Sequence, residues 1–269
     1  MSKIKSPFKF IGSFGNTRCY YDPATDQYIM AGKGGYTREQ FLTLKSLQKN
    51  RENASEFGAS SHWASLLYDS LSDIKHLMFS RCFNKITSVG KFILRQDFTS
   101  PHGFRMVGVS KVPQALLGID FNERHPFKSV LRDNYVINFS EEKKTITLTI
   151  PDFVTVRDAW WITKYYAVRL YVVVAQTADM VYNPDTKEWE PVVEGLELIS
   201  RRVVSDWMVN NSESNDVNLS VLLDDPAFSL PGTIVFVAVG AEFSLNTSNG
   251  QPNVEPHCGS MAIVKSYNA

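Results

Sequence analysis

The sequence predicts an α+β protein, in which an N-terminal β-hairpin and a helical hairpin pack on a C-terminal antiparallel β-sandwich of the jelly-roll or immunoglobulin-like kind. Three observations predict this fold: two-residue alternation near the N-terminus, apolar residues three and four positions apart in the middle of the first third, and short strand-like runs separated by turns from Phe104 onward. We expect the parts 1–100 and 101–269 to form one compact unit.

The first segment favours strands. Phe8, Phe10 and Phe14 share one side of an extended chain, and Lys9 lies on the other. A Pro/Asp-rich turn at 22–27 then separates two short β-like runs, which is typical of a hairpin.

Two helices are expected next, near 50–74 and 79–96. Thr37 with Gln40 has the form of a capping box, and it predicts an earlier helix start. The spacing of Ala54, Phe57 and Ser61 continues into the apolar residues of one helix face, and Gly58 with Ser61 would allow close approach of a neighbouring backbone.

About ten strand-like runs follow, beginning with FRMVGV at 104–109 and QALLGIDF at 114–121. Turn-forming stretches such as SEEKK and YNPDTKEW separate later runs. Many short strands without long intervening helices favour a sandwich or barrel.

Composition is that of a globular chain, with 43% hydrophobic and 12% aromatic residues. The N-terminus lacks the apolar core of a secretory signal, and the most apolar stretch, at 165–175, is interrupted by Arg169. Three widely spaced cysteines do not suggest a disulfide framework. We therefore expect a soluble, cytoplasmic protein or a virion or particle component, without a membrane partner.

Charge is unevenly distributed although the formal net charge is zero. Residues 1–51 hold nine lysines and arginines against three acidic residues, whereas residues 177–269 hold four against thirteen. The simpler interpretation is that the charged residues of a globular protein are segregated by chance. The alternative is head-to-tail attraction between basic and acidic parts of neighbouring chains.

Catalytic and cofactor motifs are absent from the sequence. Gly32–Gly35 lacks the Ser/Thr and the preceding glycine of a phosphate-binding loop, and there is no GxGxxG, HExxH, CxxC or GxSxG pattern. The adjacent acids at 141–142 and 224–225 suit turns better than paired catalytic carboxylates. We expect no cofactor, no metal and no enzymatic activity, and we do not expect nucleic acid as a partner.

Two stretches resemble a protein family. SPFKFIGSFGNTRCYY followed by KGG, and then NRENASEFG at 50–58, are similar to the PFxFxGSLGNxxxY, KGG and TRENxxEFG segments of an uncharacterised Bacteroidota family. The match covers about the first third of the chain, with Phe14 and Asn50 in place of Leu and Thr. The resemblance implies a bacterial source, chromosomal or viral. It also implies that Arg51–Asn53 and Glu56–Gly58 determine the fold, with Phe57 as an aromatic anchor and Gly58 as a close-packing residue.

The function we expect is assembly. A structural subunit of a filament, shell or phage-derived particle would use the N-terminal strand to extend a neighbour's sheet. The expected partner is therefore another copy of the chain, in a homo-oligomer. The candidate interface residues are Phe8, Lys9, Phe10, Phe14 and Arg18. The alternative is a module that binds a small molecule or glycan, with Trp160, Trp161 and Trp189 as stacking candidates.

Overall fold

In the computed structural model the chain divides between Arg51 and Glu52 into an N-terminal unit, residues 1–51, and a larger unit, residues 52–269. Residues on both sides of position 100, where the two predicted parts meet, thus belong to the same unit. The structure describes residues 2–3, 10–32, 34–140, 144–160, 164–211, 213–224, 228, 230–248, 251–253 and 258–268.

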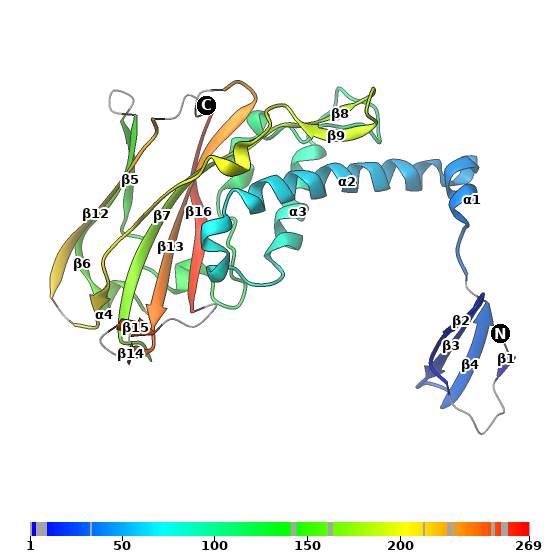
Figure 1. Cartoon of the computed structure of the whole chain (residues 1–269), viewed down its shortest axis with the longest axis horizontal. Coiled ribbons are helices and arrows are strands. Elements are labelled where there is room, and N and C mark those ends of the chain that lie inside the picture. The colour runs from blue at the N-terminus through cyan, green and yellow to red at the C-terminus, as the bar shows by residue number, and fades with distance from the viewer. Residues whose placement is uncertain are drawn as a thin grey trace. The chain divides into compact units, whose positions relative to one another are not determined.

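The N-terminal unit contains a four-stranded antiparallel sheet in the order β1-β4-β3-β2 (Figure 1). Its strands are β1 (Ser2–Lys3), β2 (Gly12–Phe14), β3 (Thr17–Asp22) and β4 (Gln27–Gly32). A short helix α1 (Arg38–Thr43) and a 3-10 turn η1 (Lys45–Leu47) follow. The hairpin around residues 22–27 is confirmed, because Asp22 pairs with Gln27. The capping box is confirmed too, with Thr37 Oγ1 accepting from Gln40 N at 3.1 Å.

Two longer helices are confirmed in the larger part of the chain. They are α2 (Gln48–Asp69) and α3 (Cys82–Leu94), joined through the 3-10 segment η2 (Ser72–Leu77). The predicted inward face of the first helix is wrong in its N-terminal half, since Ala54 and Phe57 are exposed whereas Glu56 is buried. Glu56 is buried because it takes part in an ion pair, and the spacing of apolar residues does not predict such a contact.

The close approach of the two helices occurs at Gly90 of α3 and not at Gly58. A Cβ atom at Gly90 would lie 2.7 Å from Cε3 of Trp63 and 3.1 Å from the carbonyl oxygen of Ser60. At Gly58 the nearest atom would be Cδ1 of Trp189 at 3.9 Å, which is ordinary contact. Glycine is therefore required on α3, where the Trp63 ring fills the space of a side chain.

The strands predicted over FRMVGV and QALLGIDF are wrong. Residues 104–135 form three 3-10 turns with isolated β-bridges: η3 (Val109–Lys111), η4 (Pro113–Leu116) and η5 (Phe127–Ser129). Pro113 lacks an N–H group, and Gly118 has a left-handed backbone with φ of 76°. These residues interrupt an otherwise strand-like pattern.

The main sheet of the larger unit has the path β10-β7-β13-β16, and β11 also pairs with β7. Its strands are β7 (Ala167–Ala178), β10 (Arg201–Val204), β11 (Met208–Val209), β13 (Thr233–Ser244) and β16 (Gly259–Asn268). All twelve residues of β13 are buried, and eleven of the twelve in β7 are buried. Such strands have both faces covered.

A second sheet has the order β12-β6-β5. Its strands are β5 (Val136–Ser140), β6 (Thr145–Val154) and β12 (Ser214–Leu222). The short helix α4 (Thr155–Asp158) ends β6, and η7 (Leu196–Leu198) precedes β10. Two small hairpins are β8 (Met180–Asn183) with β9 (Glu188–Pro191), and β14 (Asn246–Ser248) with β15 (Gln251–Asn253). Every described strand pair in the chain is antiparallel.

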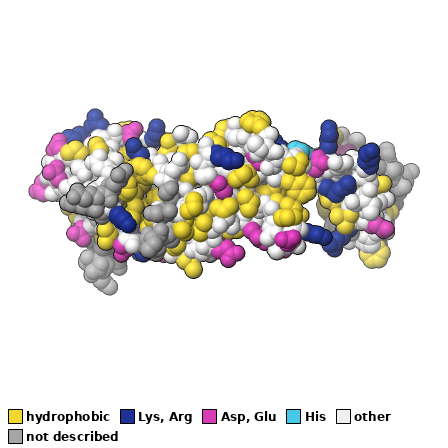
Figure 2. Space-filling view, turned by 90° about the horizontal axis from the view of Figure 1, so that it is seen from above, with side chains coloured by type: hydrophobic (Ala, Val, Ile, Leu, Met, Phe, Trp, Pro, Cys, Tyr) yellow, Lys and Arg dark blue, Asp and Glu magenta, His cyan; other side chains and the backbone are white. Residues whose placement is uncertain are grey.

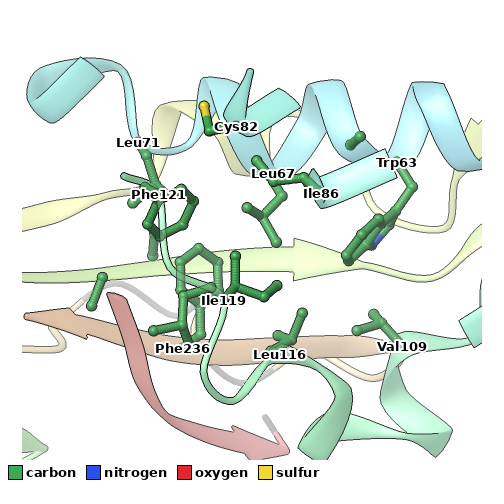
Figure 3. Packing of buried hydrophobic residues seen from close by; sticks show 14 of the residues in the cluster. Trp63, Leu67, Leu71, Cys82, Ile86, Val109, Leu116, Ile119, Phe121 and Phe236 are labelled. Atoms are coloured by element: carbon green, nitrogen blue, oxygen red, sulfur yellow. The ribbon is translucent and has the colours of Figure 1, made fainter. Parts of the chain in front are cut away.

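The main sheet separates two apolar clusters. On one face, residues of α2, α3 and the 104–121 segment pack against Tyr171, Phe236 and Met261; Figure 3 shows Phe121 over Phe236, with Ile86 and Trp63 farther along the same cluster. On the other face, residues of β6 and β12 pack against inward residues of β7 and β13. Figure 1 accordingly shows the helices and the second sheet on opposite sides of β7 and β13. Mixed helices and antiparallel sheets confirm the α+β class.

Candidate assembly surfaces

The described residues of the N-terminal unit form almost no buried interior. Among the described residues from 10 to 51, only Cys19 and Leu47 are buried. Large apolar side chains are instead exposed: Phe10, Ile11, Phe14, Tyr21, Met30, Tyr36, Leu42 and Leu44. Figure 2 likewise shows hydrophobic side chains at the surface of the chain among the charged ones. A small sheet needs a covered apolar face for stability, so this surface suits contact with another molecule.

Local turns explain why β2 is the outer strand of this sheet. Phe14 pairs with Thr17 across a two-residue turn in which Gly15 has a φ of 55°. The ring of Phe10 lies over Gly12, where a Cβ atom would meet Phe10 Cζ at 3.0 Å. Among the described strands β2 pairs only with β3, which leaves its other edge open.

Three of the five predicted interface residues lie in the described part of this unit. Phe10 and Phe14 are 49% and 82% exposed. Arg18 lies on β3 beside the Tyr20 ring, 5.9 Å from its centre, and lines a groove of about 620 Å³ with Ser13. Phe8 and Lys9 lie outside the described residues. The sheet therefore brings Phe14 and Arg18 to the same end of the β2–β3 hairpin.

The second sheet has an open edge at β12. This strand has nine residues and pairs with β6 alone among the described strands. Val217, Leu219 and Val221 point inward, whereas Asn218 and the other alternate residues are exposed. The register shifts between Asn215 and Val217, because β6 places two residues, Pro151 and Asp152, opposite Asp216. Asp152 N donates to Asp216 Oδ1 at 2.9 Å. Such a bulge increases the local twist of the strand pair.

A groove of about 520 Å³ runs along this edge. The β12 residues from Asn215 to Leu219 form one wall, and the 204–209 segment forms the other. Asp206 and Asp216 are among the described lining residues, which include no lysine or arginine. Trp207 also lines the groove, and the Arg169 guanidinium packs on its ring at 4.5 Å. The groove thus offers an open strand edge, one aromatic ring and two carboxylates.

The other long edge, that of β16, is partly closed. Gly118 N donates to Ile263 O, Ile263 N donates to Ile119 O, and Phe121 N donates to Met261 O, all at 2.9–3.0 Å. The wrongly predicted strand at 114–121 therefore covers an edge that would otherwise be free to pair.

Of the three tryptophans proposed for glycan stacking, Trp160 and Trp189 lie in the described part of the chain, and they differ in exposure. Trp189 is 9% exposed and packs in the apolar cluster between the helices and the main sheet, with its ring centre 5.4 Å from that of Tyr182. Trp160 is exposed and follows α4. Trp161 lies outside the described residues. Trp189 therefore has the role of a core side chain.

A buried carboxylate on β13 is held by three donors. Glu242 is 1% exposed and accepts hydrogen bonds from His76 Nε2 at 2.8 Å, Tyr171 Oη at 2.7 Å and Arg169 Nε at 2.5 Å. Burial raises its pKa, but these donors outweigh burial and lower the pKa overall. Burial and the Glu242 carboxylate both raise the pKa of Tyr171. The Glu242 carboxylate is charged and already accepts hydrogen bonds from three side chains, which suits a structural role.

A second cluster of carboxylates shows which contacts the charged residues of the NRENASEFG segment make. Glu56 accepts two hydrogen bonds from Arg105 and one from Gly103 N, and Glu52 accepts one from His102 Nδ1 at 2.7 Å. Arg51, at the end of the N-terminal unit, donates to the carbonyl oxygens of Phe41 and Leu44. The charged residues thus carry the contacts, whereas Phe57, expected as an anchor, is 56% exposed.

Comparison with protein-family models, curated proteins and solved structures finds no match for this chain. The site must therefore be inferred from its own chemistry. No group of three or more His, Cys, Asp and Glu in the described ranges is arranged to hold a metal. None of the described helices is long and apolar enough to cross a membrane.

Sequence reasoning did not find the residues of the β12 groove. The 196–207 segment divides into η7, β10 and the loop that carries Asp206 and Trp207. The polar pair Ser205–Asp206 inside an apolar run was the only signal of that interruption.

Proposed function

We propose that this protein is a non-enzymatic, self-assembling structural subunit of a filament, shell or phage-derived particle. The observation that carries the proposal is the N-terminal sheet, where the described residues form almost no buried interior and leave apolar side chains exposed. Covering such a surface stabilises it, so association and ordering of this unit are coupled. The Bacteroidota source and the cytoplasmic or particle location belong to the same proposal.

The proposed contact joins two strand edges from different copies. The donor is β2 with its exposed Phe14, and the acceptor is the open edge of β12 in a neighbouring chain. Pairing of two free edges supplies backbone hydrogen bonds, and side chains beside the edge supply selectivity. β12 is the best acceptor because the 118–121 segment already covers part of β16.

Charge supports the same direction of docking. Arg18 stands beside the donor strand, whereas Asp206 and Asp216 line the acceptor groove. Over the sequence, residues 1–51 carry a net charge of +6 and residues 177–269 carry −9. Opposite potentials favour the encounter of donor and acceptor over that of two donors.

Donor and acceptor are different surfaces, so the contact is heterologous. A heterologous contact repeats from chain to chain and yields rings when the rotation closes or open fibres when it does not. That geometry fits a filament or shell better than a twofold dimer.

The scaffold we infer for the acceptor is a β-sandwich. Its support is the apolar cluster shared by the sheets β10-β7-β13-β16 and β12-β6-β5, both antiparallel. The jelly-roll or immunoglobulin-like class is part of the proposal.

Static light scattering tests the proposal directly. The full-length protein should form species larger than a monomer that increase with concentration and dissociate in high salt, whereas a chain lacking residues 1–15 should remain monomeric. Monomers of both proteins at low and high salt would overturn the proposal.

A point variant removes the contact without shortening the chain. Phe14→Asp places a charge on a side chain that is 82% exposed, so the chain's own fold has little reason to change. The matched control is Phe98→Asp, since Phe98 is 87% exposed and lies in the larger unit. Assembly should be lost in the first variant and kept in the second.

The alternative function is binding of a glycan or small molecule, and one observation favours a place for it. Phe104 and Tyr182, whose ring centres are 4.8 Å apart, line a shallow groove of about 580 Å³ above the buried Trp189. Glycan-array binding that disappears with Phe104→Ala and persists with Trp160→Ala would favour this function.

A further inference from the structure

A cavity of about 400 Å³ lies between the 118–135 segment and β16, and none of its lining residues belongs to either assembly surface. Phe127, Ala262 and Ile263 give it an apolar floor and are all buried. Tyr135, Asp133 and Asp120 provide polar groups at its walls. A concave apolar site with a few convergent polar groups is the usual form of a small-molecule site, and 400 Å³ is within the common size range.

The polar groups of this cavity mainly accept hydrogen bonds. Asp120 and Asp133 are carboxylates, and the Asp133 charge acts on the Tyr135 hydroxyl. The nearby backbone N–H groups of Asn122 and Phe127 donate to Asp120 at 3.1 and 2.6 Å, so they do not face a ligand as free donors. A ligand that complements these walls must bring donors of its own.

Two aromatic rings add a preference for positive charge. The ring centres of Phe127 and Tyr135 are 6.2 Å apart, and the planes are inclined by 57°. Such a corner presents π-electron density to a cation, and carboxylates beside it strengthen that attraction. The positive charges nearby are Lys128, an exposed lining residue, and Lys85, whose Nζ donates to the Asp120 carbonyl at 3.1 Å.

We propose that this cavity binds a small organic ammonium ion, a primary amine on a short apolar body, with the charge at Asp133 and Tyr135 and the body on Phe127 and Ala262. The two carboxylates outnumber the single lysine that lines the cavity. Because no assembly residue takes part, the proposal is independent of the self-association above.

The pKa values of the lining residues Asp120 and Tyr135 agree with this environment. Burial raises the pKa of Asp120, and burial together with the Asp133 charge raises the pKa of Tyr135 to about 12. Groups with perturbed pKa values in a cavity are more common at binding sites than elsewhere. An ammonium ion stabilises a carboxylate, so it should bind more weakly in acid than at neutral pH.

The test uses the full-length protein and phenethylamine as the probe. Calorimetry should give saturable binding with one amine per chain, whereas 2-phenylethanol, which has the same apolar body without the charge, should bind at least tenfold more weakly. Methyl NMR signals of Ile263 and Ala262 should shift with the amine. Equal affinity for the alcohol, or no saturable binding of the amine, would overturn the proposal.

Variants locate the charge. Asp133→Asn, at an exposed residue, should weaken amine binding about tenfold or more, because it removes a charged acceptor. Lys128→Gln should leave binding intact or strengthen it, since it removes a competing cation. The matched control is Asp185→Asn, an exposed acid outside the cavity, which should have no effect. Unchanged binding in Asp133→Asn, or loss in Lys128→Gln, would contradict the proposed orientation.

Discussion

Arg105 and Glu56 form a bidentate ion pair, with Nε to Oε1 and Nη2 to Oε2 both at 2.7 Å. Gly103 N donates to the same carboxylate at 2.9 Å. Burial raises the pKa of Glu56, but these bonds outweigh burial and lower the pKa overall. One helix side chain thus fixes the loop that contains Gly103 and Arg105.

Glu56→Ala should therefore destabilise the protein by about 3 kcal/mol, since it leaves Arg105 and the Gly103 N–H without their partner. Urea denaturation followed by circular dichroism measures this loss. The control is Glu39→Ala at an exposed residue of α1, where a change within about 0.5 kcal/mol is expected. A loss below about 1 kcal/mol for Glu56→Ala would contradict the structural role.

Stability should fall in acid because of Glu242 and Glu56. Both have folded pKa values below the usual 4.5, so the unfolded chain binds protons more readily. Their contribution is complete above pH 4.5 and is lost as pH falls through the lower folded pKa. Urea midpoints between pH 6 and 3 measure this, and Glu242→Gln should flatten the profile. Asp120 works in the opposite direction: its raised pKa contributes stability below its usual 3.8, and this is lost as pH rises.

Gly90→Ala and Gly58→Ala should have opposite effects. The new methyl at residue 90 collides with Trp63, so we expect a loss of about 1–3 kcal/mol despite alanine's better helix propensity. At residue 58 the nearest atom is 3.9 Å away, and alanine should gain up to about 1 kcal/mol. Thermal unfolding of both variants checks this, and equal effects would show that the helix contact is misplaced.

Two assembly-defective variants should complement each other. Phe14→Asp removes the donor, and the double variant Asp206→Lys with Asn218→Lys places two positive charges in the acceptor groove. Each protein alone should be monomeric. A mixture retains one good donor and one good acceptor, so it should form heterodimers and stop there.

The control for the double variant is Asp185→Lys with Asn84→Lys. It makes the same charge change at exposed residues outside the groove and should assemble normally. Heterodimers that grow further, or a mixture that remains monomeric, would refute donor–acceptor pairing.

Much of the fold could be predicted because local pattern and burial agree there. β6 alternates between intermediate and buried residues, and α3 has a clear apolar stripe, so period alone identifies them. The 104–121 segment failed because its apolar residues pack under helices and along β16 without forming a continuous ladder. A sequence pattern records which residues are apolar, but it does not record what they pack against.

The residues of the candidate surfaces also differ in whether a local sequence pattern could predict them. The place of Phe14 on a strand could be predicted because alternation near a turn is a local feature, whereas Phe10 of the same run precedes β2. Asp206 and Asn218 line one groove, and Asp133 and Val264 line one cavity although more than a hundred residues separate them in sequence. No spacing rule reports such neighbours, since only the packing of the sheets creates them.

The buried strand β13 has a consequence for how the larger unit comes apart. Phe236 and Val237 are neighbours in sequence, yet they belong to different apolar clusters. The strand is a shared wall, so neither cluster can lose it and survive alone. Its amides should be among the last to exchange with deuterium, and the helices and the second sheet should unfold in one step.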